Sequence, residues 1–265
     1  MKYGDLYLQC RRALMETEDP QAAGLMARNL VAFYSGKRQE EILRDRDRYA
    51  GEKTCADVEQ ATQRLLEGEP LPYVLGEWDF YGMQLAVSPD VLIPRDDTCA
   101  VAALAINKAL FLGQNPRILD LCTGSGCIGL AVATRVKDSK VTLADYSQEA
   151  LAVAKHNIVN HKLTSRVSCV RANALEPAPA FLGKFDLIVS NPPYISKEEI
   201  ETLQTELKDH EPRLALDGGE DGLDYYRIIA ENANKHLARG GILIMEVGEG
   251  QAQAVAGLFK YCDYA

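Results

Sequence analysis

The sequence lacks the features that mark several classes of protein. No apolar run is long enough to span a membrane, and the first residues lack the apolar core of a signal peptide. The seven cysteines include no Cys-x-x-Cys pair, and the four histidines are too scattered to predict a metal site. The formal net charge of −9 weighs against a protein that wraps bare nucleic acid. We therefore expect a cytoplasmic protein with free thiols, no metal and no membrane anchor.

The composition predicts a folded chain of one large or two smaller domains. Of the 265 residues, 47% are hydrophobic, which is enough for a sizeable core. Residues 1–75 carry apolar side chains at helical spacing and predict a helical bundle, for which we expect a role in docking the substrate. Residues 76–93 place aromatic and apolar residues around Gly82 and predict a β-hairpin that links two domains. The second domain is expected over residues 94–265.

Residues 94–265 alternate between strand and helix patterns. The alternation predicts an α/β domain with a doubly wound parallel sheet and right-handed crossovers. The expected strands cover residues 118–121, 141–144, 167–171, 185–190 and 242–247. The expected helices cover residues 96–112, 127–136, 146–160, 197–208, 225–237 and 251 onward.

A glycine-rich loop follows the first of these strands. Its sequence from Gly124 to Gly129 is Gly-Ser-Gly-Cys-Ile-Gly, a G-x-G-x-x-G pattern between a strand and a helix. Such a loop allows close backbone approach and offers free N–H groups at the helix N-terminus, so it predicts a nucleotide or nucleoside site. Asp145, at the end of the next strand, is placed to accept hydrogen bonds from ribose hydroxyls. The alternative is a purely structural turn.

Two cofactors fit this loop: a nicotinamide dinucleotide and S-adenosylmethionine. Asp120 immediately precedes the loop region and would repel a pyrophosphate, but it could hold the ammonium group of a methionine moiety. Alternatively, Asp120 caps the amides of the loop itself, which is compatible with either cofactor.

The stretch from Phe185 to Ile195 contains the second candidate site. An apolar strand stops at Asn191-Pro192-Pro193-Tyr194, because the prolines supply no N–H group. This predicts a rigid corner at the carboxyl end of a strand, where α/β sheets bind ligands. The Asn191 side-chain oxygen and the Pro192 carbonyl can accept the hydrogens of a planar –NH2 group, and Tyr194 can cover its face. The alternative is a proline-rich turn with a surface tyrosine.

These residues, with several others, resemble a known family. The segments are Leu92-Ile93-Pro94-Arg95, 120–126, 191–194, 211–216 and Glu246-Val247-Gly248. They are similar to the HemK/PrmC family of class I S-adenosylmethionine-dependent methyltransferases, over about residues 70–255. The resemblance implies a Rossmann-like fold with a small N-terminal helical bundle. It also implies methylation of the glutamine side-chain amide in the Gly-Gly-Gln loop of class I peptide-release factors, with S-adenosylhomocysteine as the product.

The resemblance also assigns roles to individual residues. It implies that Asn191 contacts both cofactor and substrate, that Asn191, Pro192 and Tyr194 are catalytic, and that Pro193 joins them in binding the glutamine. It implies a monomeric enzyme with a protein substrate, without stable nucleic acid binding. The cofactor would contact the following residues: Asp120, Cys122, Thr123, Gly124, Ser125, Gly126, Asp145, Asn173, Ala174 and Asn191.

The chain departs from the family pattern at three places. Asn173 stands where the family usually has an acid, and Asp96-Asp97-Thr98-Cys99 replaces the usual Pro-Glu-Thr-Glu. The last expected helix ends near Ala265, whereas the fold normally adds two strands, so we expect the methyltransferase domain to be C-terminally truncated. For Arg95, which is shared with the family, a surface salt bridge and a contact with substrate or cofactor are both open.

Three other functions remain open. A DNA or RNA adenine-N6 or cytosine-N4 methyltransferase would use the same corner, but it would require base flipping and a basic groove. A non-catalytic scaffold that binds S-adenosylmethionine is the second, and a dehydrogenase is the third.

Overall fold

The computed structural model describes residues 1–177, 179–203, 205–262 and 264, and the chain divides into two compact units. The first unit is Met1–Gly76 and the second begins at Glu77.

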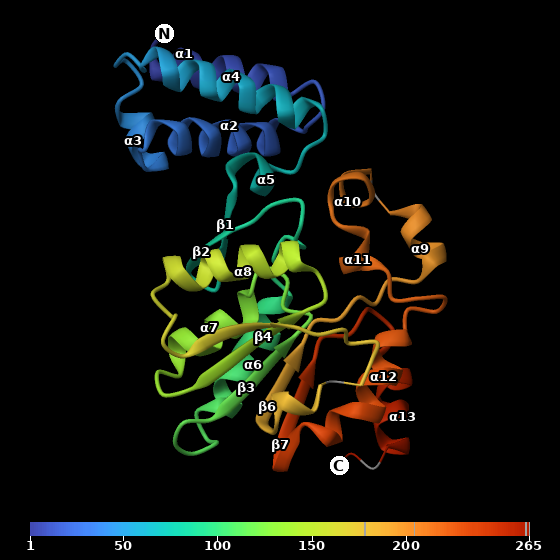
Figure 1. The fold of residues 1–265 in the computed structure, drawn as a ribbon. Coiled ribbons are helices and arrows are strands. Elements are labelled where there is room, and N and C mark those ends of the chain that lie inside the picture. Colours follow the sequence, from blue (N-terminus) through green and yellow to red (C-terminus); the bar gives the residue numbers. More distant parts are fainter. Residues whose placement is uncertain (178, 204, 263, 265) are drawn as a thin grey trace. The chain divides into compact units, whose positions relative to one another are not determined.

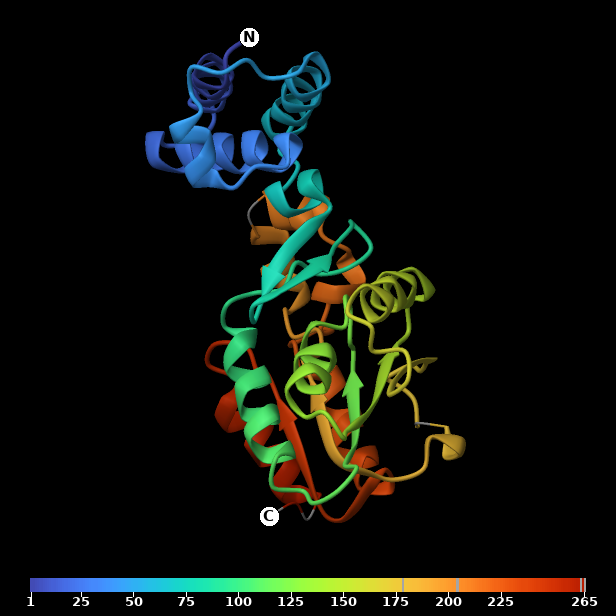
Figure 2. The same ribbon diagram turned by 90° about the vertical axis from the view of Figure 1, so that its left-hand side faces the viewer.

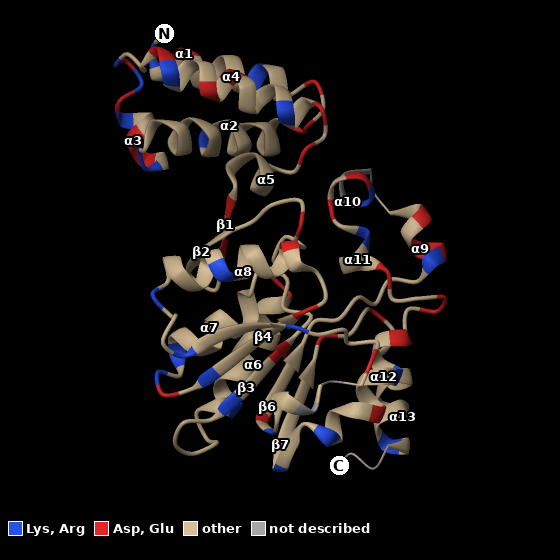
Figure 3. Ribbon diagram, in the orientation of Figure 1, with Lys and Arg blue, Asp and Glu red and all other residues tan. Residues whose placement is uncertain are grey.

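The first unit is helical, as the sequence predicts. Its helices are α1 (Tyr3–Leu14), α2 (Pro20–Ser35), α3 (Gln39–Arg44), α4 (Glu52–Leu66) and α5 (Leu71–Leu75). Asp19 caps α2 by accepting hydrogen bonds from two backbone amides, and Gly36 ends it in a left-handed conformation. Helix α5 lies at the end of the segment predicted to be helical, residues 1–75. Acidic and basic residues are interspersed along α1, α3 and α4 (Figure 3).

A β-hairpin opens the second unit. Strands β1 (Glu77–Phe80) and β2 (Met83–Ala86) pair antiparallel, and Tyr81 and Gly82 turn the chain with φ angles of 53° and 74°. Phe80, Met83 and Leu85 are buried in the same core as the central sheet. The hairpin therefore packs as part of the second unit.

The second unit is built on a five-stranded parallel sheet (Figure 1). The strands are β3 (Arg117–Leu121), β4 (Lys140–Asp145), β5 (Val167–Arg171), β6 (Phe185–Ser190) and β7 (Leu237–Met245). Their order is β5-β4-β3-β6-β7, so the chain runs outward from β3 in one direction and then returns to build the other half. This confirms the predicted doubly wound sheet, and the direction reverses between β3 and β6.

Helices cover both faces of this sheet. Because strand side chains alternate between faces, Ile118, Val141 and Leu187 pack with helices α6 (Thr98–Ala109), α7 (Cys127–Arg135) and α8 (Gln148–Asn160). Leu119 and Ile188 face the other way, toward α12 (Asp224–Asn232) and α13 (Ala252–Tyr261). Figure 2 shows α6, in green, beside β7. The central strands β3, β4 and β6 are thus buried on both faces, as their near-continuous apolar runs predict.

Two expectations about element boundaries were wrong. The single helix expected over 197–208 is interrupted: the described residues form α9 (Lys197–Thr202) and α10 (Thr205–His210), followed by α11 (Arg213–Leu216). Leu203 is extended and ends α9, and residue 204 lies outside the described residues. The last strand was expected over residues 242–247, but β7 begins at Leu237 and ends at Met245. Its pairing with β6 continues through a register shift, although the strand contains two glycines. Glu246 therefore lies just beyond the strand.

Replacing Gly129 with alanine is expected to lower the free energy of unfolding by about 1–3 kcal/mol, the usual cost of overpacking. A Cβ atom at this position in α7 would lie 2.3 Å from Leu143 Cδ2 and 2.9 Å from Asp120 Oδ2. Urea denaturation measures the effect. The matched control is Gly257→Ala in α13, where a Cβ meets nothing within 4 Å, and which is expected to be neutral or stabilising. Equal stability of the two variants would contradict close packing at Gly129.

Candidate active site

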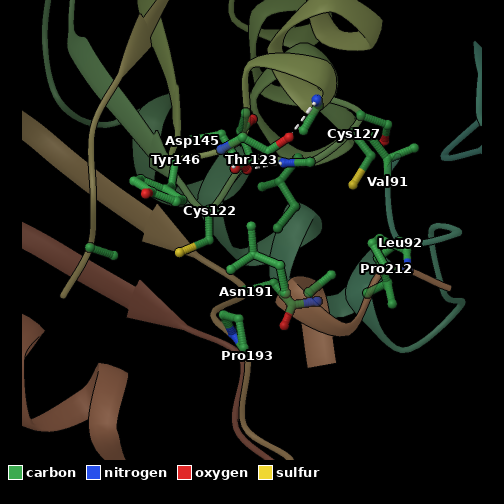
Figure 4. A pocket seen from close by; sticks show the side chains of 18 of the residues that line it. Val91, Leu92, Cys122, Thr123, Cys127, Asp145, Tyr146, Asn191, Pro193 and Pro212 are labelled. Carbon is green, nitrogen blue, oxygen red and sulfur yellow. Dashed lines mark hydrogen bonds between the residues drawn. The ribbon is translucent and has the colours of Figure 1, made fainter. Parts of the chain in front are cut away.

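A pocket lies at the carboxyl ends of the strands (Figure 4). It encloses about 930 Å³ of space, part of it open to solvent. Its walls come from the ends of β3, β4, β5 and β6, from residues 90–98 and from α11. Of the predicted site residues, the wall contains Cys122, Thr123, Gly124, Ser125, Asp145, Asn173, Ala174, Asn191 and Pro193.

The loop between β3 and α7 forms one side of the pocket. Cys122 has a φ of 58°, Gly124 of 53° and Gly126 of 86°. Gly126 is the N-cap of α7, so the first amides of the helix are directed toward the loop. A left-handed cysteine is uncommon and puts its side chain in the pocket wall. Burial raises the pKa of the Cys122 and Cys127 thiols, so both stay neutral at physiological pH.

Asp145 ties the loop to the end of β4. Its Oδ2 accepts a hydrogen bond from the Gly124 amide at 2.9 Å, and its Oδ1 accepts one from the Ser147 amide at 3.0 Å. Each oxygen keeps a second lone pair, so the carboxylate can still accept from a diol in the pocket. Burial raises the pKa of Asp145, although the backbone hydrogen bonds oppose this shift.

Asp120 lies behind the loop rather than in the described wall of the pocket. Its side chain is 1% exposed, and Oδ2 accepts hydrogen bonds from Thr123 Oγ1 at 2.6 Å and from the Gly129 amide at 2.8 Å. The structure therefore matches the second interpretation of Asp120, a cap for the amides of the loop. Asp120 lies two residues after Ile118 in β3, and side chains alternate between the faces of a strand, so Asp120 points to the face of the sheet that α7 covers. Gly126, Pro192 and Tyr194 are also outside the described pocket wall.

Replacing Asp120 with asparagine is expected to remove a pH dependence of stability. Burial raises the pKa of Asp120 to about 7, while the Thr123 and Gly129 hydrogen bonds oppose this. A carboxyl with a raised folded pKa contributes stability at low pH that is lost as pH rises toward 7. Relative to the native protein, Asp120→Asn should therefore gain at least about 1 kcal/mol between pH 5 and pH 8, since one pKa unit is about 1.4 kcal/mol. Denaturant unfolding at both pH values measures this, and a constant difference would refute it.

The far end of the pocket follows β5. Asn173 and Ala174 lie in the wall, as predicted, but the Asn173 side chain is engaged locally. Its Oδ1 accepts from the Leu175 amide at 3.0 Å, and its Nδ2 donates to Glu176 at 2.9 Å. Asn173 therefore shapes the turn, and apolar surface from Ala174 and Tyr225 lines this end.

Asn191 lies beside the glycine loop. Strands β3 and β6 are neighbours, Leu121 pairs with Ser190, and the Ser190 hydroxyl donates to the Leu121 carbonyl at 2.7 Å. The residues that follow these two strand ends, Cys122 and Asn191, both line the pocket (Figure 4). The Asn191 Nδ2 donates to Thr98 Oγ1 at 3.3 Å, which leaves Oδ1 available as an acceptor.

The rest of the corner is packed inward. Pro192 and Pro193 are buried, and the Tyr194 hydroxyl lies 3.5 Å from Glu246 Oε1. The Tyr194 carbonyl accepts a hydrogen bond from Gln251 at 2.9 Å. The corner is thus rigid, as its prolines predict, but the Tyr194 ring turns toward the segment after β7.

Arg95 forms an ion pair with Glu211, as one of the two interpretations predicts, but the partner is buried rather than at the surface, and Arg95 also lines the pocket. The Glu211 side chain is 2% exposed and also accepts a hydrogen bond from the Ile93 amide at 3.3 Å. Burial raises the pKa of Glu211, and Arg95 opposes this shift. The pair connects the segment before α6 to α11, whose residues Leu214 and Ala215 line the pocket mouth.

The charges of the pocket fit a cationic cofactor. Among the described wall residues, Arg95 is the one cationic side chain, and Glu211 already neutralises it. Asp90 and Asp145 are acidic, and Asp120 lies directly behind the loop. A pyrophosphate would meet these carboxyl groups without a free cation, whereas a sulfonium and an ammonium group are attracted to them.

Comparisons with known proteins agree with this geometry. The family described as "Methyltransferase small domain" matches residues 99–220, and the family described as "PrmC N-terminal domain" matches residues 5–76. A release factor glutamine methyltransferase of Geobacter sulfurreducens is 42% identical over 76% of this chain and 69% of that protein. One of Bradyrhizobium diazoefficiens is 38% identical over 93% of this chain and 82% of that protein.

The chain belongs to the release factor glutamine methyltransferase family. It is a methyltransferase that uses S-adenosylmethionine, as the sequence predicts. A solved methyltransferase from Pyrococcus furiosus supports the fold, with a TM-score of 0.50 and 19% identity over 78% of this chain and 89% of that chain. No helix among the described residues has the length and apolar character needed to cross a membrane.

Two residues that face the site were missed by the sequence analysis. Thr98, the first residue of α6, holds Asn191, and Glu246 follows the end of β7. The rule that ligands bind at the carboxyl ends of strands could have indicated Glu246, since it lies one residue before the end of the fifth predicted strand, residues 242–247. For Thr98 the sequence carries no signal, because its contact depends on the packing of α6 against β6.

Proposed function

We propose that this enzyme methylates the side-chain amide nitrogen of the glutamine in the Gly-Gly-Gln loop of class I peptide-release factors. The observation that carries the proposal is the position of Asn191, which shares one pocket with the glycine loop on the neighbouring strand. The two relatives described above are named release factor glutamine methyltransferase, and residues 5–76 match a domain described as PrmC N-terminal.

We assign the cofactor to the glycine-loop side of the pocket. Residues Cys122 to Gly126 hold the methionine end of S-adenosylmethionine, Asp145 holds the ribose, and Asn173 and Ala174 flank the adenine. When bound, the cofactor supplies an activated methyl group on sulfonium sulfur. The acidic wall favours this cationic group, and its apolar surfaces exclude water from it.

Asn191 acts on the glutamine amide. An amide nitrogen is a poor nucleophile because its lone pair is delocalised into the carbonyl. The Asn191 Oδ1 and the Pro192 carbonyl accept its two hydrogens, which orients the nitrogen and favours the positive charge that develops on it. Pro193 and Tyr194 complete the substrate corner. No general base is required before the methyl group moves.

We assign substrate docking to the N-terminal helical domain, residues 1–75, joined by the hairpin segment 76–93 to the methyltransferase domain, residues 94–265. We further propose a cytoplasmic monomer. The net charge of −9 and the interspersed charges of α1, α3 and α4 support a protein substrate over a stable nucleic acid partner.

A ribosomal protein is the second candidate substrate. A ribosomal protein uL3 glutamine methyltransferase of Francisella tularensis is 40% identical to this chain. The match covers 73% of this chain and 61% of that protein. The same pocket would serve a glutamine amide in either protein. The match to the PrmC N-terminal description favours the release factor.

The experiment uses the purified enzyme, methyl-labelled S-adenosylmethionine and, in separate reactions, a class I release factor, uL3 and DNA. We expect label on the Gly-Gly-Gln peptide of the release factor and none on a release factor whose loop glutamine is replaced by alanine. Label on uL3 alone would support the second candidate. Label on DNA would refute protein methylation.

A further inference from the structure

Glu246 lies next to Asn191 at the edge of the sheet, although it is outside the described wall of the pocket. Ser190 pairs with Met245, and the Glu246 amide donates to the Ser190 carbonyl at 3.0 Å. Strands β6 and β7 therefore end side by side, and the residues beyond these ends are Asn191 and Glu246. Any influence of the Glu246 carboxyl on a bound substrate has to pass through its neighbours.

Three polar side chains surround this carboxyl. The Tyr194 hydroxyl lies 3.5 Å from Oε1, and Thr98 and Asn191 also favour the charged form of the group. Thr98 is 2% exposed and accepts the Asn191 Nδ2 hydrogen bond at 3.3 Å. The Glu246 Oε2 is buried and has no hydrogen-bond partner within the part of the chain that the structure describes. The residues thus form a half-buried cluster, with Thr98 fully buried and the Glu246 carboxyl behind the Asn191 amide.

We propose that Glu246 is a positioning residue for methyl transfer, which acts through Thr98 and Tyr194 on Asn191. The carboxylate attracts the Thr98 hydroxyl proton, so the Thr98 oxygen is left to accept from Asn191 Nδ2. This fixes the side-chain amide of Asn191 with Oδ1 toward the substrate nitrogen. The inference rests on the proposed function, because it assigns Oδ1 to the glutamine amide.

The charge of Glu246 also acts on the reaction itself. A negative charge behind the –NH2 end of an amide polarises it and makes its oxygen a stronger acceptor. The substrate nitrogen becomes more positive as the methyl group arrives, so this acceptor stabilises the transition state more than the bound substrate. Binding of the cofactor, which lies on the glycine-loop side, should depend little on Glu246.

A pH dependence follows from the surroundings of Glu246. Burial raises the pKa of its carboxyl, although Thr98, Asn191 and Tyr194 lower it. The other ionisable groups that face it are Asp97 before α6, Tyr226 of α12 and Cys127 of α7. Because the charged form is the active one, kcat should fall as pH decreases through this raised pKa.

The test compares Glu246→Gln with the native enzyme at saturating release factor and S-adenosylmethionine. We expect kcat to fall about tenfold or more at pH 8, while the Kd for S-adenosylmethionine changes by less than about threefold. The fall of kcat at low pH that comes from protonation of Glu246 should disappear in this variant. The matched control is Glu249→Gln, an exposed glutamate three residues along the chain, which should leave kcat and its pH profile unchanged.

A second pair of variants keeps the test decisive if Glu246→Gln does not fold. Thr98→Val removes the hydroxyl and keeps the shape, whereas Thr98→Ser keeps the hydroxyl. We expect Thr98→Ser to keep most of the native turnover and Thr98→Val to lose it. Equal kcat values for Thr98→Val and Thr98→Ser, or an unchanged pH profile in Glu246→Gln, would overturn the inference. The proposed function would still stand in that case if the native enzyme methylates the release factor. A native enzyme that does not methylate the release factor would instead overturn the proposed function.

Discussion

Replacing Asn191 with alanine is expected to lower kcat by about 100- to 1,000-fold, the usual cost of removing one hydrogen bond made to developing charge. The Kd for S-adenosylmethionine should change by less than about threefold. The reason is that we assign Oδ1 to the substrate amide, whereas we assign the cofactor to the glycine loop and Asp145, which line the same pocket. Single-turnover methylation of the release factor and calorimetric titration of the cofactor measure the two quantities separately.

The matched control is Asn160→Ala, which truncates an exposed asparagine at the end of α8. It should leave both quantities unchanged. Equal losses in turnover and cofactor affinity for Asn191→Ala would show that the residue supports the cofactor pocket rather than the transition state.

Replacing Asp145 with alanine is expected to weaken S-adenosylmethionine binding by at least about 30-fold, or about 2 kcal/mol. The carboxylate accepts from the Gly124 and Ser147 amides, so the variant loses these two contacts with the loop together with the acceptor that we assign to the ribose. Because burial raises the pKa of Asp145, the native affinity should decline as pH falls through this raised pKa, since the protonated carboxyl has lost an acceptor. The variant should lack this decline. Calorimetric titration over a series of pH values from neutral to acidic measures both effects.

Asp186→Ala is the matched control for Asp145. This carboxylate also accepts a backbone amide, that of Arg117 at 2.8 Å, but it lies at the opposite end of the strands. The control is expected to lose stability without a change in cofactor affinity. A similar loss of affinity in both variants would mean that the effect comes from general destabilisation of the sheet.

Several parts of the fold could be predicted because their causes are local. Apolar runs buried on both faces mark the parallel strands, and the α/β alternation predicts the doubly wound sheet that the structure contains. The two prolines after Asn191 end β6 wherever that strand lies. Local signals failed between residues 197 and 216, where short helices are held by tertiary contacts such as the Arg95–Glu211 pair.

The candidate site divides in the same way. The sequence indicates the glycine loop, Asp145 and Asn191, because each follows directly on a strand. It could not show that Asp120 turns inward to cap the loop, since the direction depends on the packing of α7 against β3. Nor could it show that the Asn173 side chain is engaged in its own turn.

By itself, the sequence determined which residues stand at the strand ends and what chemistry they carry, because strand ends, proline stops and glycine turns depend on neighbours along the chain. Only the tertiary structure decided which strand ends meet. The pairing of β6 with β3 on one side and β7 on the other brings Asn191 between the glycine loop and Glu246. That order is set by contacts between residues far apart in the chain, for which a periodic pattern carries no information.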